Sequence, residues 1–104
     1  MPTLGEINFN YKKAMSQVAE LNEIAGKLKK AGNDSLESCM KDVKQNWKGE
    51  NSEAYISKGN KLKGKIVKSA GDISKVAATL STMAKNIRAA ELKNIETAKT
   101  VSNK

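Results

Sequence analysis

A seven-residue rhythm of apolar side chains runs along most of the chain, and it restricts the fold more than any other feature. In the first half, steps of three and four residues join Leu4, Ile7, Tyr11, Ala14, Val18, Leu21, Ala25 and Leu28. In the second half, the same steps join Tyr55, Gly59, Leu62, Ile66, Ser69, Ile73, Val76, Leu80, Met83, Ile87 and Ala90. This spacing places each set on one face of an α-helix. The sequence therefore predicts an all-α fold built from two long amphipathic helices.

The ends of these helices follow from their capping and turn residues. Thr3 and Glu6 have the spacing of a capping box, which starts the first helix near residue 4. Gly49 can leave a helix with a positive φ angle, and a short connection makes neighbouring helices antiparallel. We therefore expect one hairpin domain over residues 1–104. Its predicted parts are a helix over 4–46, a turn over 47–51, a helix over 52–95 and a frayed tail over 96–104.

The apolar pattern slips by one residue after Leu28, where the sequence reads Ala31-Gly32-Asn33-Asp34. Two interpretations remain open. Gly32 ends one helix and Asp34 caps another, or the helix continues through residues 32–34 with a local kink. We favour the continuous helix because the apolar face resumes within two turns.

Two helices lying side by side bury one seam and enclose little core for their length. The seam is predicted to contain Leu4, Ile7, Tyr11, Val18, Leu21, Leu28, Leu62, Ile66, Ile73, Val76, Leu80 and Ile87. Ala70, Ala77 and Ala84 repeat every seven residues beside that seam and are a candidate partner face. They are either ordinary helix formers at its border or a surface where a second hairpin completes a four-helix bundle by dimerisation.

The composition contains few of the residue types that catalysis uses. The 104 residues include no histidine and one cysteine, Cys39, which has no neighbouring base in the sequence to activate it. We therefore predict no catalytic, cofactor-binding or metal-binding residues, and a protein that is not an enzyme.

The chain is basic, with 19 Lys and Arg against 11 Asp and Glu and a formal net charge of +8. Only Arg88 is an arginine, and aromatics are few, so base-specific nucleic-acid recognition is not expected. One side of the second helix carries a row of lysines: Lys58, Lys61, Lys65, Lys68 and Lys75. This row is either a solvated face or a surface for an acidic partner.

Neither a cleavable signal peptide nor a membrane span is predicted. The first residues lack a basic segment followed by an apolar one, and no apolar stretch approaches the roughly 20 residues of a membrane helix. The expectation is a protein made in the cytoplasm that would need a leaderless route to leave the cell.

The tripeptide Trp47-Lys48-Gly49 at the expected turn carries a family resemblance. A Trp-x-Gly motif between two amphipathic helices resembles the WxG family of small type VII (ESX-type) secretion proteins, which includes the early secretory antigenic target proteins. The resemblance implies secretion without a cleaved signal, contact with the type VII machinery, and pairing with a second helical protein. That partner would be a second copy, a related chain, or the helical N-terminal region of a larger effector such as an LXG-type toxin.

The chain departs from this family after the second helix. Many members carry a Tyr-x-x-x-Asp/Glu export signal there, and this chain has no aromatic residue after Tyr55. This departure favours export together with a partner. The motif also has a purely mechanical interpretation, in which Trp47 buries its indole at the hairpin end and Gly49 reverses the chain. A membrane-active cytotoxic helical protein and a basic nucleic-acid-binding protein are the alternative functions.

Overall fold

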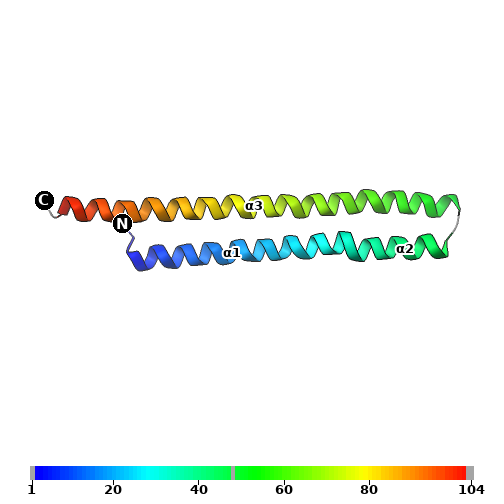
Figure 1. Ribbon diagram of the computed structural model, residues 1–104, viewed down its shortest axis with the longest axis horizontal. Coiled ribbons are helices and arrows are strands. Elements are labelled where there is room, and N and C mark those ends of the chain that lie inside the picture. Colours follow the sequence, from blue (N-terminus) through cyan, green and yellow to red (C-terminus); the bar gives the residue numbers. More distant parts are fainter. Residues whose placement is uncertain (1, 48, 103–104) are drawn as a thin grey trace. The chain divides into compact units, whose positions relative to one another are not determined.

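The chain is helical almost throughout in the computed structural model, which describes residues 2–47 and 49–102, without the side chain of Ser102 (Figure 1). The elements are α1 (Leu4–Lys30), the π-helical segment η1 (Ala31–Leu36), α2 (Glu37–Asn46) and α3 (Glu50–Ser102). These residues contain no strand. The predicted all-α class is confirmed.

The start of α1 is fixed by the residue that precedes it. Thr3 Oγ1 accepts a hydrogen bond of 3.1 Å from the Glu6 amide, and the Thr3 carbonyl accepts one of 3.0 Å from the Ile7 amide. These bonds satisfy amide groups that a helix start otherwise leaves without partners. The helix begins at Leu4, in agreement with the capping spacing.

The one-residue slip in the apolar pattern coincides with η1. Lys30 before it and Glu37 after it both have right-handed helical φ and ψ angles, so the backbone stays helical from α1 into α2. A π-helical turn holds an extra residue compared with an α-helical one. It therefore absorbs the slip, and Gly32 and Met40 are both buried. Of the two open interpretations, the structure has the continuous helix, and Asp34 caps no new one.

The second helix is longer at both ends than the sequence interpretation expected. It begins at Glu50 instead of residue 52 and continues to Ser102, so the predicted fraying of residues 96–102 is wrong. The apolar face followed in the sequence ends near Ile95, but Ile95 and Ala98 are half-buried on a neighbouring face. The Thr100 hydroxyl also donates to the Glu96 carbonyl at 3.1 Å. Residues 103 and 104 lie outside the described residues.

The contacts within the chain group its residues into two units. Unit 1 comprises the described residues of Met1–Leu21 and Val76–Lys104. Here the first part of α1 lies beside the last part of α3, blue beside orange in Figure 1. Tyr11 contacts Arg88, and the later residue Met15 contacts the earlier residue Ser81, so the two segments are antiparallel.

Unit 2 comprises Asn22–Lys75 and contains the chain reversal. Lys63 pairs with Glu37 and Tyr55 with Trp47, so α2 and the first part of α3 are antiparallel. The chain reverses between the end of α2 at Asn46 and the start of α3 at Glu50, where the sequence places the turn. That units 1 and 2 act as one hairpin domain over 1–104 stays a prediction.

Little of either unit is buried. Among the described residues, the buried hydrophobic side chains are Ile7, Val18, Ala25, Met40, Ala70 and Ala77. Half of them are alanines, which contribute little apolar area each. Both units therefore have thin interiors, which affects how their exposed apolar faces are interpreted.

Candidate functional site

The turn between α2 and α3 is built around Gly49. Trp47 leaves the helix in an extended conformation, with φ −111° and ψ 133°, while its amide still donates to the Val43 carbonyl at 2.8 Å. Gly49 follows with φ +117°, a backbone conformation that strains any residue with a Cβ. Its carbonyl accepts hydrogen bonds from the Ser52 hydroxyl at 2.8 Å and the Glu53 amide at 3.3 Å. Gly49 is thus the residue that allows the reversal and starts α3; Lys48, the middle residue of the motif, lies outside the described residues.

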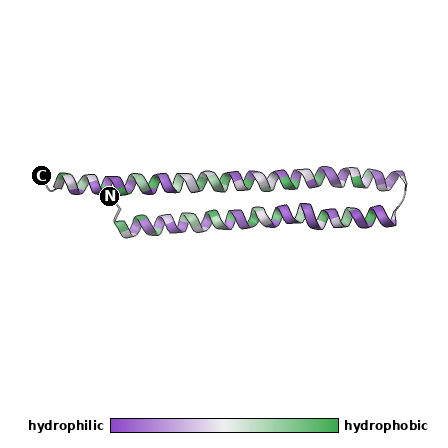
Figure 2. Ribbon diagram, viewed as in Figure 1, coloured by the Kyte–Doolittle hydropathy of each residue, from purple (hydrophilic) through white to green (hydrophobic). Residues whose placement is uncertain are grey.

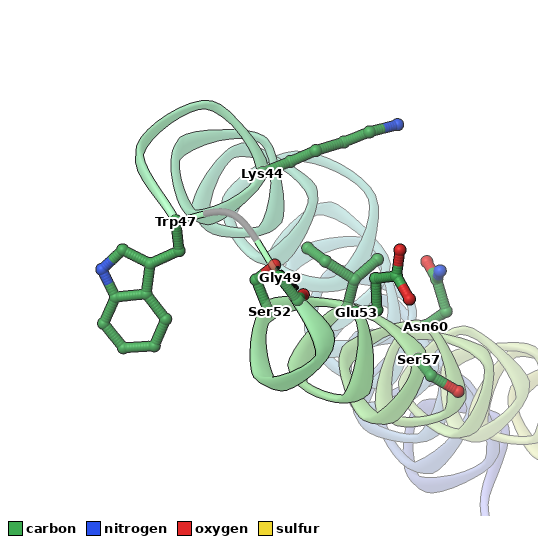
Figure 3. Close-up of a pocket in the computed structure, with 8 residues that line it drawn as sticks. Lys44, Trp47, Gly49, Ser52, Glu53, Ser57 and Asn60 are labelled. Atoms are coloured by element: carbon green, nitrogen blue, oxygen red, sulfur yellow. Dashed lines mark hydrogen bonds between the residues drawn. The ribbon is translucent and has the colours of Figure 1, made fainter.

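Trp47 does not bury its indole, contrary to the mechanical interpretation of the motif. Its side chain is 57% exposed and contacts the ring of Tyr55, with centroids 6.2 Å apart and planes tilted by 60°. Figure 3 shows the indole projecting away from the other labelled residues of the turn. The cause is the extended backbone at Trp47, which takes its side chain off the apolar face of α2. Two aromatic rings are therefore accessible beside the turn.

A groove of about 520 Å³ lies next to Trp47 in unit 2. Its lining residues are Lys44, Trp47, Gly49, Ser52, Glu53, Ile56, Ser57 and Asn60 (Figure 3). Lys44 and Glu53 bring one charge of each sign, and the other polar side-chain groups are two hydroxyls, an amide and the indole N–H of Trp47. Such a mixed lining suits contact with a polypeptide.

The first helix buries most of the positions that the apolar rhythm assigns to the seam. Ile7 and Val18 are buried, and Tyr11, Leu21 and Leu28 are half-buried. Leu4 is the exception: it is exposed at the first residue of α1, a correction to the predicted seam.

The second helix turns a different face inward from the one predicted. Ile66 and Ile73 are half-buried, but the other predicted seam residues on α3 are exposed: Leu62, Val76, Leu80 and Ile87. The alanines assigned to a partner face lie inside, with Ala70 and Ala77 buried and Ala84 half-buried. Four of the six seam assignments on α3 are therefore wrong, and so is the assignment of the alanines to a partner face. The alanines are not free for a partner, and the large side chains are.

The two helices of unit 2 approach each other closely at two glycines. A Cβ on Gly59 would lie 2.5 Å from Met40 Sδ, and a Cβ on Gly32 would lie 3.1 Å from Ile66 Cγ2. Each glycine thus accepts a large side chain from the opposite helix. Gly32 on η1 and Gly59 on α3 let the helices come together, and a larger residue at either position would press on the facing side chain.

Exposed apolar side chains follow α3 beside this inner face. In unit 1, steps of four, three and four residues join Val76, Leu80, Met83 and Ile87, which we call the exposed stripe. Figure 2 shows hydrophobic and hydrophilic residues alternating along the whole of α3. Contiguous exposed apolar surface of this kind marks interaction sites more often than isolated exposed residues do.

Arg88 borders the exposed stripe in unit 1. Its guanidinium carbon lies 4.7 Å from the centre of the Tyr11 ring, a cation–π contact. Its Nε is buried and has no hydrogen-bond partner among the described residues. Ile87, Arg88 and Glu91 line a groove of about 190 Å³ with Tyr11. The sequence singled out Arg88 as the one arginine but gave no sign that it sits over an aromatic ring.

An ion pair joins the two helices of unit 2. Lys63 Nζ donates to Glu37 Oε2 at 2.9 Å, and both side chains are partly exposed. The hydrogen bond and the positive charge of Lys63 lower the pKa of Glu37 below its ordinary value. Sequence reasoning missed this pair because its members are 26 residues apart and only the fold brings them together.

Among residues 2–47 and 49–102, no three His, Cys, Asp or Glu side chains cluster where they could hold a metal ion. Cys39 is a free, exposed thiol. None of the described helices is both long and apolar enough to cross a membrane. The features that stand out are the accessible Trp47, the exposed stripe and the lysines of α3.

Comparisons with known proteins give no relatives: no family model, curated protein or solved structure matches the chain.

Proposed function

We propose that the chain is a helical partner protein of a type VII-like secretion system. It acts as a substrate or as a targeting adaptor of a secreted effector and binds by helix packing. In this proposal it is made in the cytoplasm, carries no cleavable signal and completes a four-helix bundle with its partner. It performs no catalysis and needs no cofactor.

The observation that carries the proposal is the exposed stripe beside a thin interior. Val76 and Ile87 are 53% and 55% exposed, although the spacing of the stripe is that of a helix interface. Full burial of such a side chain is worth about 1.5–3 kcal/mol. Covering the exposed half of all four side chains gains on the order of 3–6 kcal/mol. Association itself costs about 4–15 kcal/mol, so the stripe alone does not hold a partner. A partner must therefore contact more of the chain than this stripe.

The turn supplies the link to secretion. Trp47 and Gly49 occupy the reversal between two helices, as in the WxG proteins that the sequence resembles. The exposed indole contributes little to the interior of unit 2, so a role in recognition accounts for it better than a role in folding. Because the chain lacks the Tyr-x-x-x-Asp/Glu signal after Tyr55, the proposal assigns that signal to the partner.

Export from a cell with an active type VII system tests this proposal. We expect the tagged chain to reach the medium only when the partner and the secretion ATPase are both present. Trp47→Ala should abolish export and leave helicity unchanged, because the indole is exposed. Phe9→Ala is the matched control, since Phe9 is an exposed aromatic on α1, away from the turn. Export that continues without the ATPase, or that Trp47→Ala and Phe9→Ala reduce equally, would contradict the proposal.

Association with anionic membranes is a second candidate function, favoured by one observation. Leu62 is exposed on the helix that carries Lys58, Lys61 and Lys65, and an apolar side chain beside lysines suits a negatively charged lipid surface. Much of the apolar rhythm on α3 is exposed, so it is available to a lipid surface. Leakage of phosphatidylglycerol vesicles at neutral pH would support this candidate, and intact vesicles would remove it.

A further inference from the structure

A small groove opens on the lysine-bearing side of α3 in unit 2. It holds about 250 Å³ and is lined by Leu36, Tyr55, Lys58, Gly59 and Leu62; we call it the lysine groove. Tyr55 and Leu62 are each half exposed and are seven residues apart, so they share one face of α3. Gly59 lies between them in the sequence, packs against Met40 and adds no side chain of its own to the groove. The groove therefore has the shape and apolar lining to take a side chain from another helix.

The charge on the α3 side of this groove is of one sign. Between Glu53 and Asp72 the chain has five lysines and no acidic residue: Lys58, Lys61, Lys63, Lys65 and Lys68. Lys63 is occupied by Glu37. Lys58 lines the groove and Lys65 lies seven residues further along the same face, so both border the apolar pair. A helix entering the groove meets a positive edge.

This charge argues against a second copy of the chain as the occupant. The exposed large apolar residues of α1, namely Leu4, Phe9 and Ile24, are separated by five and fifteen residues and form no heptad stripe. A second copy would therefore have to offer its own α3. That arrangement sets two lysine-rich faces against each other, which is repulsive.

We propose that the lysine groove binds an amphipathic helix of a different polypeptide, whose apolar residue enters beside Leu62 and whose flanking glutamates or aspartates meet Lys58 and Lys65. The inference rests on the proposed function and specifies the chemistry of the partner. The acidic flank gives attraction at long range, and the apolar contact gives the fit. Residues 76–90 of unit 1 have the same excess of positive charge, with Lys85 and Arg88 and no acidic residue.

A pair of designed helical peptides tests the proposal on the full chain. Both carry leucine at their a and d positions; one has glutamate at the flanking positions and the other has lysine. We expect fluorescence anisotropy to show binding of the glutamate peptide at about 20 mM salt and weaker binding at about 300 mM. The lysine peptide should bind at least about tenfold more weakly.

Variants of the chain assign the binding to the groove. Leu62→Ser should weaken binding of the glutamate peptide at least about fivefold. Ile24→Ser is its matched control, because Ile24 is a similarly exposed apolar residue of unit 2 on α1. The double variant Lys58→Glu/Lys65→Glu should exchange the peptide preference, whereas Lys12→Glu/Lys13→Glu makes the same charge change on α1 and should preserve it. Circular dichroism at 222 nm checks that each variant keeps its helicity.

Three outcomes would overturn the inference. Equal binding of the two peptides, or no binding of either, would show that the groove does not select an acidic helix. A wild-type dimer in sedimentation equilibrium that Leu62→Ser dissociates would make a second copy the occupant. Binding to phosphatidylglycerol vesicles that Leu62→Ser abolishes, without peptide discrimination, would make it a membrane. The export assay is independent of these results, so loss of export with intact peptide discrimination would reject the proposed function and keep the groove.

Discussion

Two neighbouring residues, Val76 and Ala77, decide which face of α3 lies inside. Val76 is 53% exposed and Ala77 is 0% exposed, although the apolar rhythm of the sequence assigns Val76 to the seam. We therefore expect Val76→Ala to be nearly neutral and Ala77→Leu to be destabilising. Because the residues are adjacent, they share the same helix and the same solvent conditions. They differ in the direction in which their side chains point from the helix.

The magnitudes follow from burial. Val76→Ala removes two methyl groups, worth about 0.8 kcal/mol each when buried, so about half exposure leaves a loss of about 0.8 kcal/mol. The better helix propensity of alanine returns about 0.5 kcal/mol, so the net change is below about 0.5 kcal/mol. Ala77→Leu forces extra carbons into a filled site and should cost about 1–3 kcal/mol. If Val76 were in the seam, its truncation would cost about 1.6 kcal/mol before any cavity is counted.

Urea unfolding followed by circular dichroism at 222 nm measures the free energy of unfolding, and two protein concentrations reveal any contribution from association. Ala78→Leu is the control for added bulk, because Ala78 is exposed on the same helix and should tolerate leucine within about 0.5 kcal/mol. A loss above about 1.5 kcal/mol for Val76→Ala, with Ala77→Leu neutral, would refute the inner face described for α3.

Two further predictions concern unit 2. Gly64→Ala should raise the free energy of unfolding by about 0.5–1 kcal/mol, because a Cβ there meets no atom within 4 Å and alanine favours the helix. Gly32→Ala should gain nothing or lose about 1–2 kcal/mol in the same denaturation assay, because its Cβ would press on Ile66 Cγ2 at 3.1 Å; equal stabilisation by both changes would contradict the close approach. The lowered pKa of Glu37 implies stability that is fully present above its ordinary pKa of 4.5 and is lost as the pH falls through the lowered value. Wild type and Glu37→Gln should therefore differ most near neutral pH and converge in acid, and a constant difference across a pH titration would reject a role for the Lys63 pair.

The slip in the apolar pattern after Leu28 shows what local sequence spacing can and cannot predict. The sequence located the irregularity at Ala31-Gly32-Asn33-Asp34 but left a helix break and a continuous helix both open. Either arrangement would return the apolar face to the same side of the chain. Gly32 decides between them through its contacts, because Ile66 and Val67 of α3 lie against its backbone. Those contacts depend on a residue more than thirty positions away, and local spacing cannot contain them.

The sequence by itself determined the all-helical class, the start of α1 and the position of the chain reversal. Each depends on neighbours a few residues apart: apolar spacing, a capping threonine before Glu6, and a glycine after Trp47. Tertiary structure alone decided which of two adjacent faces of α3 turns inward. Both faces repeat every seven residues, and apolar rhythm cannot rank them. The choice depends on how closely two backbones approach, and the alanine face allows the nearer approach while leaving the large side chains exposed.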